Sequence, residues 1–453
     1  MPLGPGYAIE RQVVELDYSA QAPDRVHVRV EYRLQNVGDR ELTSLRAWLP
    51  SEQGGRMDLR VRSGDREILV QGSEDPSASL IAFPLPSSLQ PGQKRTFGIE
   101  YNLHINGREP SGVGDFYFDR PEVWLPGLAK PEGFFAEGTK WAAKTDVNIR
   151  VPPGFRVLAA GQDLGQRSRR GATEFRFLLR DSDSQPFVVA GPYREQRVRS
   201  PDGTVAFWTL QPLPPESAQS AGARLAAAVR TYEKIFGPAG KDSHAVYLVE
   251  ASEWLGTMPP WAMGHSFPQV AVLNRQAFAA GVTSDAFLAL AQRWLARTWF
   301  GYLVRPATPL ERRLGEALIE YADLSAREAR DAVASRHSYA ARLLRAYDAA
   351  LLEAPEKPLA ADWDATPAPA QQQIAELKAA LFLLALEDRV GQESLHRGLR
   401  RMVQALREQS WRVNDLRAAL EAESGQNLYE VFRAWLNQTG IPAEFRAAYQ
   451  ERR

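Results

Sequence analysis

The sequence of 453 residues contains no cysteine. This absence excludes disulfide bonds, thiolate nucleophiles, iron–sulfur clusters and zinc sites with cysteine ligands. It leaves the redox compartment open, because a chain without thiols is compatible with either environment. Any zinc site would have to be built from histidines and carboxylates.

The sequence also lacks an excess of charge of one sign. Lys plus Arg number 55 and Asp plus Glu number 55, so the formal net charge is zero. No block of like charges stands out, and we expect no nucleic-acid partner and no attraction to anionic membranes. The sequence does not determine an oligomeric state.

Long hydrophobic runs are missing as well. No stretch approaches 18 consecutive apolar residues, so we expect no transmembrane segment. The first six residues lack the basic and apolar regions of a signal peptide. This fits either a cytoplasmic protein or an exported one whose signal has been removed, and the sequence favours neither.

The first 210 residues have the pattern of β-strands. From Arg25 to Leu34 apolar and polar residues alternate strictly, which predicts a half-buried antiparallel strand. Shorter alternations follow at 147–151 and 175–179, and turn signals such as Pro153-Gly154 separate them. We therefore expect a β-sandwich domain over residues 1–210.

The remaining residues, 211–453, have the pattern of a mainly helical domain. Apolar residues acquire helical spacing from Glu216 to Phe236, and two short strand-like runs follow before residue 284. From Ser284 on, nearly all segments predict helices, including 370–389, 392–408, 413–423 and 428–437. The Pro/Ala-rich stretch at about 355–370 predicts an exposed linker.

Several short motifs, taken in order, suggest a family. They are Val123-Trp124-Leu125-Pro126, Val151–Phe155, Phe187–Tyr193, Ala419–Gly425 and the residues Phe432, Trp435, Gly440 and Pro442. In this order the chain resembles the aminopeptidase N family of zinc metallopeptidases, the gluzincins, from about Tyr7 to Tyr449. The resemblance implies a multi-domain fold of β plus α+β/α class, in which an N-terminal β-sandwich precedes a thermolysin-like, mostly helical domain.

The catalytic signature of that family is altered in this chain. The family carries H-E-x-x-H on a helix, where the two histidines bind zinc and the glutamate activates water. Alignment on Trp299-Phe300-Gly301 puts Arg293 and Arg297 at the histidine positions and Trp294 at the position of the glutamate. An arginine has five donors and no lone pair, so it cannot bind a metal ion. Trp294 cannot exchange a proton usefully.

The histidine content leads to the same conclusion without an alignment. No two histidines lie three or four residues apart, so no helix can present a pair of imidazole ligands. The six histidines are His27, His104, His244, His265, His337 and His396. We therefore expect no catalytic residues, no metal ligands and no zinc cofactor.

Two further family elements are altered and one is retained. The G-x-M-E-N loop, whose Glu binds the amino group of the substrate, corresponds to residues 261–265, where Met263 is kept and Gly264 and His265 replace Glu and Asn. The catalytic tyrosine before K-G-A corresponds to Glu376. The third zinc ligand of the family is retained as Glu316.

Two interpretations of the arginine pair remain open. Arg293 and Arg297 can be solvated charges on a helix surface. Our hypothesis is that Arg297 occupies the position of the zinc ion and pairs with Glu316, since a buried carboxylate without its cation is costly. The tryptophans near this region either pack in the core or line a peptide groove. They are Trp254, Trp261, Trp294 and Trp299.

Three functions fit these observations. The first, which we favour, is a catalytically inactive aminopeptidase-like protein that binds a peptide or protein partner or acts structurally. The second is an active metallopeptidase or other hydrolase with a non-standard site. The third is a scaffold whose former cleft is filled by side chains.

Overall fold

The computed structural model describes most of the chain, and it divides into two compact units. The first comprises Met1–Arg194, Thr209–Gln211 and Glu250–Pro259, and the second comprises Glu195–Trp208, Pro212–Val249 and Pro260–Arg453. The described residues are 6–48, 56–68, 80–105, 114–118, 125–128, 144–169, 171–180, 187–239, 245–251, 264–267, 269–330, 336–363, 367–407 and 409–449.

The first unit contains an eight-stranded sheet. Its order is β12-β13-β10-β1-β2-β7-β4-β5, and all neighbours are antiparallel except β1 and β10, which are parallel. The strands are β1 (Tyr7–Tyr18), β2 (Arg25–Asn36), β4 (Arg56–Ser63), β5 (Arg66–Ile68), β7 (Lys94–His104), β10 (Lys144–Val151), β12 (Gln162–Arg169) and β13 (Ala172–Arg180). The strand expected at 25–34 is β2, and its alternation is confirmed: Val26, Val28 and Val30 are fully buried.

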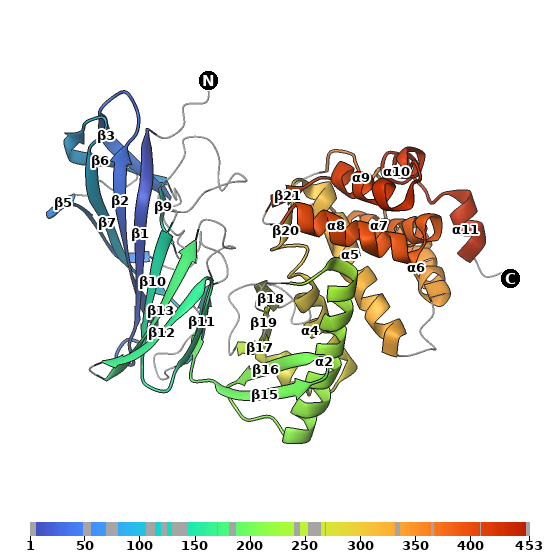
Figure 1. Ribbon diagram of the computed structural model, residues 1–453, viewed down its shortest axis with the longest axis horizontal. Helices are drawn as coiled ribbons and strands as arrows, with labels where there is room; N and C mark the ends of the chain where they lie inside the picture. Colours follow the sequence, from blue (N-terminus) through green and yellow to red (C-terminus); the bar gives the residue numbers. More distant parts are fainter. Residues whose placement is uncertain are drawn as a thin grey trace. The chain divides into compact units, whose positions relative to one another are not determined.

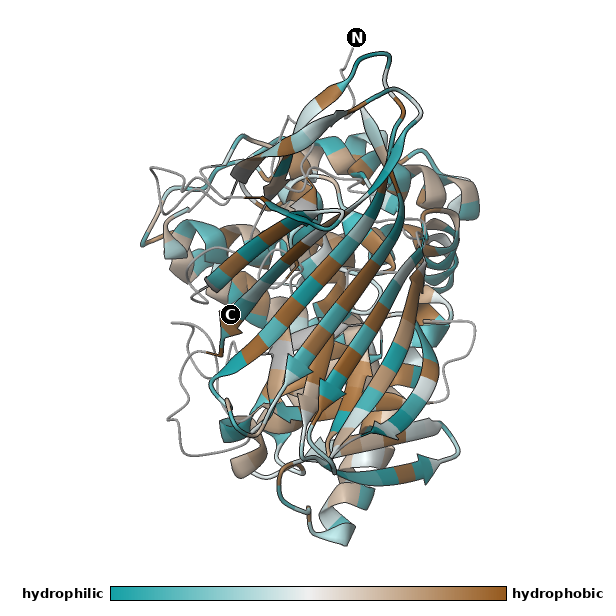
Figure 2. Ribbon diagram, turned by 90° about the vertical axis from the view of Figure 1, so that its left-hand side faces the viewer, coloured by the Kyte–Doolittle hydropathy of each residue, from teal (hydrophilic) through white to brown (hydrophobic). Residues whose placement is uncertain are grey.

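Two three-stranded sheets pack on the apolar face of this large sheet. Phe83 of β6 contacts Phe97 of β7 with ring centroids 5.9 Å apart, and Tyr18 of β1 contacts Phe116 of β8 at 5.0 Å. The small sheets are β6-β3-β9 and β11-β14-β8, formed by β3 (Leu42–Trp48), β6 (Leu80–Leu89), β8 (Phe116–Phe118), β9 (Gly127–Leu128), β11 (Arg156–Ala159) and β14 (Val188–Gly191). Hydrophilic and hydrophobic residues alternate along the large sheet, as Figure 2 shows, because only one face packs against other strands.

The second unit begins with a five-stranded mixed sheet of order β15-β16-β17-β19-β18. Its strands are β15 (Arg194–Ser200), β16 (Gly203–Thr209), β17 (Val246–Ala251), β18 (Gly264–Phe267) and β19 (Val270–Asn274). We predicted a first domain up to residue 210. β16 pairs in parallel with β17, so most of β15 and β16 belongs to the second unit.

Helices make up the rest of the second unit (Figure 1). They are α2 (Pro215–Phe236), α3 (Arg275–Ala279), α4 (Asp285–Ala296), α5 (Pro309–Arg330), α6 (Arg336–Ala350), α7 (Pro369–Val390), α8 (Gln392–Ala405), α9 (Val413–Ser424), α10 (Tyr429–Leu436) and α11 (Ala443–Tyr449), with the short strands β20 (Val304–Pro306) and β21 (Gln409–Trp411). The helix expected from Ser284 is confirmed as α4, and the Ser284 hydroxyl caps it by accepting from the Phe287 N–H at 3.2 Å. Among the described residues, no helix is long and apolar enough to cross a membrane.

The Pro/Ala-rich stretch before α7 is not simply an exposed linker. Leu359 is fully buried, and the Ala360 N–H donates to the Leu436 carbonyl at 2.9 Å. The Glu356 carboxylate accepts from Lys378 Nζ at 2.6 Å, and both side chains are buried. The prediction relied on composition, whereas Leu359 and Glu356 hold part of this segment against the helices.

Candidate functional site

The centre of the candidate site is an arginine pair on α4 that faces a carboxylate on α5. Arg293 lies in the last turn of α4 and Arg297 is its C-terminal cap residue, so their spacing of four puts both on one side of the helix. Arg297 Nη2 donates to both carboxylate oxygens of Glu316, at 2.6 and 2.8 Å. Arg293 Nη2 donates to Glu316 Oε2 at 3.2 Å. The expected pairing of Arg297 with Glu316 is therefore present.

A second carboxylate extends this cluster. Glu320 lies one turn after Glu316 on α5, and its Oε1 is 3.6 Å from Arg293 Nη1. The Tyr339 hydroxyl of α6 donates to Glu320 Oε2 at 3.5 Å. Arg293 thus bridges two carboxylates, and we call these four residues, Arg293, Arg297, Glu316 and Glu320, the arginine–glutamate cluster.

The charges of the cluster shift the pKa values of its members. Burial lowers the pKa of Arg293, but attraction to Glu316 and Glu320 outweighs burial and holds this pKa above its usual value. Burial raises the pKa of the Glu320 carboxyl, and the charges of Glu376 and Glu316 raise it further, whereas Arg293 opposes the shift. The Arg293 guanidinium therefore stays charged, and the Glu320 carboxyl protonates more readily than an ordinary glutamate.

Trp294 packs against Arg297. The Cζ of Arg297 lies 4.0 Å from the centroid of the Trp294 ring, which is a cation–π contact. Trp294 is partly buried against the core that α2 and α4 form on the five-stranded sheet. The indole and Glu316 together fix the Arg297 guanidinium from two directions.

Glu376 lies at the edge of the cluster on α7. It is exposed and accepts from Gln372 Nε2 at 2.9 Å. Its charge acts on Arg293, on Glu320 and on Arg313, whose pKa is lowered by burial. The guanidinium of Arg313 lies 4.1 Å from the ring centroid of Trp363.

The residues that we aligned with the G-x-M-E-N loop are not all described. Met263 lies outside the described residues, as do Trp254 and Trp261. Gly264 and His265 begin β18, where they pair with Leu273 and Val272 of β19.

Trp299 belongs to the core of the second unit. It is 1% exposed, and its Nε1 donates to the Gly237 carbonyl at 2.8 Å. Core packing is therefore the correct interpretation for Trp299.

The donor atoms of the site do not fit a zinc ion. Within the described part of the chain, no group of three or more His, Cys, Asp or Glu side chains is arranged to hold a metal ion. Both oxygens of Glu316 already accept from guanidinium groups, which have no lone pair for a metal. Charge pairing, rather than metal coordination, is what this arrangement can provide.

Comparisons with known proteins show the fold. No protein-family model and no curated protein matches the chain. A solved M1 zinc metallopeptidase from Deinococcus radiodurans matches with a TM-score of 0.65 and 17% identity, over 97% of this chain and 96% of that one. A mutant of that organism's M1 zinc metallopeptidase, bound to a Tyr-Ser-Ala substrate, matches with a TM-score of 0.63 and 17% identity, over 96% of each chain. A two-domain M1 zinc metallopeptidase mutant bound to L-tryptophan matches with a TM-score of 0.62 and 16% identity, over 97% of this chain and 96% of that one.

The chain has the two-domain fold of the M1 zinc metallopeptidases. The expected fold class is thus confirmed, with a large N-terminal β-sheet unit and a mainly helical C-terminal unit.

Three residues of the site were not anticipated from the sequence. Glu320 lies four positions after Glu316 on a predicted helix, so helical spacing could have found it. Arg313 and Trp363 come from α5 and from the segment before α7, and their contact depends on the fold of that segment. No local pattern indicates such a pair.

Proposed function

We propose that this protein is a catalytically inactive relative of the M1 aminopeptidases that binds a peptide or protein partner. The observation that carries the proposal is the contact of Arg297 Nη2 with both oxygens of Glu316. In our interpretation Arg297 replaces the metal ion as the cation that neutralises Glu316, and Arg293 and Trp294 replace the remaining members of H-E-x-x-H.

The chemistry of hydrolysis supports this proposal. Hydrolysis by a zinc peptidase requires a Lewis acid that polarises the carbonyl and a base that activates water. A guanidinium with a high pKa supplies neither function well, and an indole has no basic nitrogen. The candidate site retains charge and aromatic surface, which suit recognition of a polar ligand better than cleavage of a peptide bond.

The proposed partner class rests on the fold and on solved neighbours. Neighbouring structures hold Tyr-Ser-Ala, L-tryptophan or L-arginine in mutant M1 peptidases. In a peptide-binding role, this chain would bind a peptide as those proteins do but would not hydrolyse its peptide bond.

The experiment combines metal analysis with binding and turnover. Protein purified without chelator is measured for zinc by mass spectrometry, and it is incubated with aminoacyl reporters and with the peptide Tyr-Ser-Ala. We expect no stoichiometric zinc, no chelator-sensitive cleavage, and saturable calorimetric binding of the intact peptide. Cleavage of any substrate would favour the active-hydrolase interpretation. Absence of peptide binding at millimolar concentration would contradict the recognition role and favour a scaffold.

A further inference from the structure

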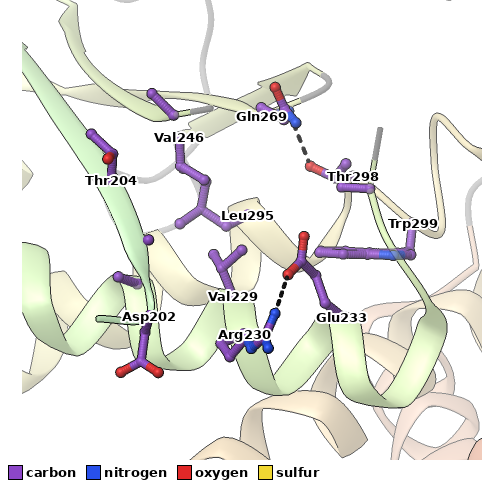
Figure 3. A pocket seen from close by; sticks show the side chains of 14 residues that line it. Asp202, Thr204, Val229, Arg230, Glu233, Val246, Gln269, Leu295, Thr298 and Trp299 are labelled. Atoms are coloured by element: carbon purple, nitrogen blue, oxygen red, sulfur yellow. Dashed lines mark hydrogen bonds and ion pairs between the residues drawn. The ribbon is translucent and has the colours of Figure 1, made fainter. Parts of the chain in front are cut away.

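A separate cavity of about 350 Å³ lies in the second unit (Figure 3). It is bounded by α2, by the C-terminal end of α4 and by residues at the starts of β16, β17 and β19. Leu295 lines it, whereas Arg293 on the same helix pairs with Glu316. Two residues turn an α-helix by about 200°, so the cavity and the arginine–glutamate cluster lie on opposite sides of α4. The cavity is a different site.

One part of the cavity wall is apolar. Ala226 and Val229 of α2 face Val246 of β17 and Leu295 of α4. Leu295 is 2% exposed, and Val229 and Val246 are partly buried. A volume of about 300–1,000 Å³ with apolar walls and a few polar groups is typical of small-molecule sites. The apolar part therefore suits a small hydrocarbon or aromatic group.

The charged part of the wall is acidic on balance. Among the described residues, two acidic side chains, Asp202 and Glu233, and one basic side chain, Arg230, line the cavity. Glu233 lies in the last turn of α2, where the helix dipole places negative charge and disfavours a carboxylate. Such a placement is unfavourable for helix stability, and a bound cation would offset it.

Within the described part of the chain, Glu233 forms an ion pair with Arg230, and this pair is weak. Arg230 Nη1 lies 3.8 Å from Glu233 Oε2, beyond hydrogen-bond distance. The Arg230 side chain is 57% exposed, and the Glu233 side chain is 22% exposed. An exposed ion pair of this length contributes little free energy, so another cation can replace Arg230 at low cost.

An aromatic ring lies next to this carboxylate. Trp299 contacts Tyr232 and Phe236, the α2 residues on either side of Glu233, with ring centroids 6.0 and 5.9 Å apart. Figure 3 shows Glu233 and Trp299 together on the cavity wall. The hydrogen bond from Trp299 to Gly237 fixes the indole. Because Trp299 is 1% exposed, it forms part of the buried wall next to Glu233, and the carboxylate is the group that can bind a cation.

A strained residue completes the wall. Gln269 has a φ of 64°, in the left-handed region that non-glycine residues rarely occupy. Its N–H donates to the Thr298 hydroxyl at 3.4 Å, and its carbonyl accepts from the Tyr247 N–H at 2.7 Å. Strain of this kind concentrates at binding sites.

We propose that this cavity binds a small organic cation with an apolar body, such as an arylalkyl primary amine. The ammonium group takes the place of Arg230 beside Glu233. The apolar body packs against Val229 and Leu295.

The probe is 2-phenylethylamine, titrated calorimetrically into the full-length chain. Its matched analogues are 2-phenylethanol, which is neutral, and phenylacetate, which is anionic. Four variants accompany the wild type. Glu233→Gln removes the charge, Val229→Phe fills the apolar part, and Arg230→Gln removes the internal competitor. Glu353→Gln is the control, because Glu353 is exposed and does not line the cavity.

We expect the amine to bind saturably and the alcohol and phenylacetate to bind at least about tenfold more weakly. Glu233→Gln should weaken amine binding about tenfold, and Val229→Phe should abolish it. Arg230→Gln should strengthen amine binding about two- to fivefold. Glu353→Gln should have no effect.

Several results would overturn the proposal. They are failure of the wild type to bind the amine at about 10 mM, equal binding of the amine and the alcohol, or unchanged affinity in Glu233→Gln. Weaker binding in Arg230→Gln would also overturn it, since it would mean that the cavity selects anions. Thermal melts of each variant show whether a loss of binding reflects a loss of folding.

Discussion

One nitrogen of Arg297, Nη2, donates to both oxygens of Glu316. Arg293 reaches only one of these oxygens, at the longer distance of 3.2 Å, and divides its charge between Glu316 and Glu320. The two arginines are therefore not equivalent, although they occupy the same face of one helix. Arg297 is the main counter-charge of Glu316, and Arg293 links the two carboxylates.

We expect Arg297→Ala to destabilise the protein by about 1–3 kcal/mol and Arg293→Ala to destabilise it less. Glu316 loses two short hydrogen bonds in the first variant and one longer bond in the second. Urea unfolding at pH 7 measures both. The double variant Arg297→Ala/Glu316→Ala should lose less unfolding free energy than the sum of the losses in Arg297→Ala and Glu316→Ala, because it leaves no Glu316 carboxylate without its partner. Strict additivity would show that the pair is not coupled.

Restoring H-E-x-x-H at residues 293–297 tests whether α4 is the helix that corresponds to this signature. The variant Arg293→His/Trp294→Glu/Arg297→His places two imidazoles on the face that contacts Glu316 and frees its oxygens. We expect this variant to bind about one zinc per chain, because two histidines and a glutamate are a complete protein ligand set for zinc. Metal analysis after dialysis measures the zinc. Adding Glu316→Ala should remove it, and a folded triple variant without zinc would contradict our alignment of the signature.

The pH dependence of stability should depend on His396. Burial, together with the charges of Arg336 and Arg400, lowers the pKa of His396 from 6.5 to about 4, and its Nε2 lies 2.9 Å from the Tyr321 hydroxyl. Between these two pH values the unfolded chain binds a proton that the folded chain does not. His396 therefore leaves stability unchanged above pH 6.5 and lowers it as the pH drops from 6.5 towards 4.

The variant His396→Gln measures this contribution. Urea midpoints at pH 7.5 and 5 give the loss of stability on acidification for the wild type and for the variant. We expect a smaller loss in the variant, because glutamine does not titrate. An equal loss in both proteins would show that other groups cause the acid sensitivity.

The pair of Lys378 and Glu356 should be important for anchoring the segment before α7. Lys378 is fully buried, and its Nζ donates to Glu356 and to the Gln438 carbonyl, each at 2.6 Å. Glu356→Ala leaves a buried ammonium without its counter-charge, so we expect a loss of about 3–5 kcal/mol in urea unfolding. Glu356→Ala/Lys378→Met should recover part of this loss. A double variant as unstable as Glu356→Ala would mean that the stability is lost through the altered packing of the segment and not through the unpaired charge of Lys378.

Elements with a strong local pattern could be predicted from the sequence. The alternation in β2 and the serine cap of α4 determine those elements locally, and both are found where expected. The membership of β15 and β16 in the second unit could not be predicted, because it depends on parallel pairing of β16 with β17 across a helix. Pairing between distant segments leaves no periodic signal in either one.

The candidate site was accessible from the sequence only in part. The resemblance supplied the register that brings Arg297 opposite Glu316, and simple charge complementarity predicted their contact. The contact of Arg313 with Trp363 depends on how the segment before α7 is anchored by Leu359 and Glu356. A composition rich in proline and alanine gave no indication of that anchoring.

The position of β1 has a consequence for how the first unit forms. β1 precedes both of its partners in the sequence, yet it lies between β2 and β10 inside the eight-stranded sheet. Its partner β2 follows directly, whereas β10 is synthesised more than a hundred residues later and pairs with β1 in parallel. During translation one edge of β1 therefore stays without its partner until β10 emerges. An unpaired strand edge is a site at which other chains can pair.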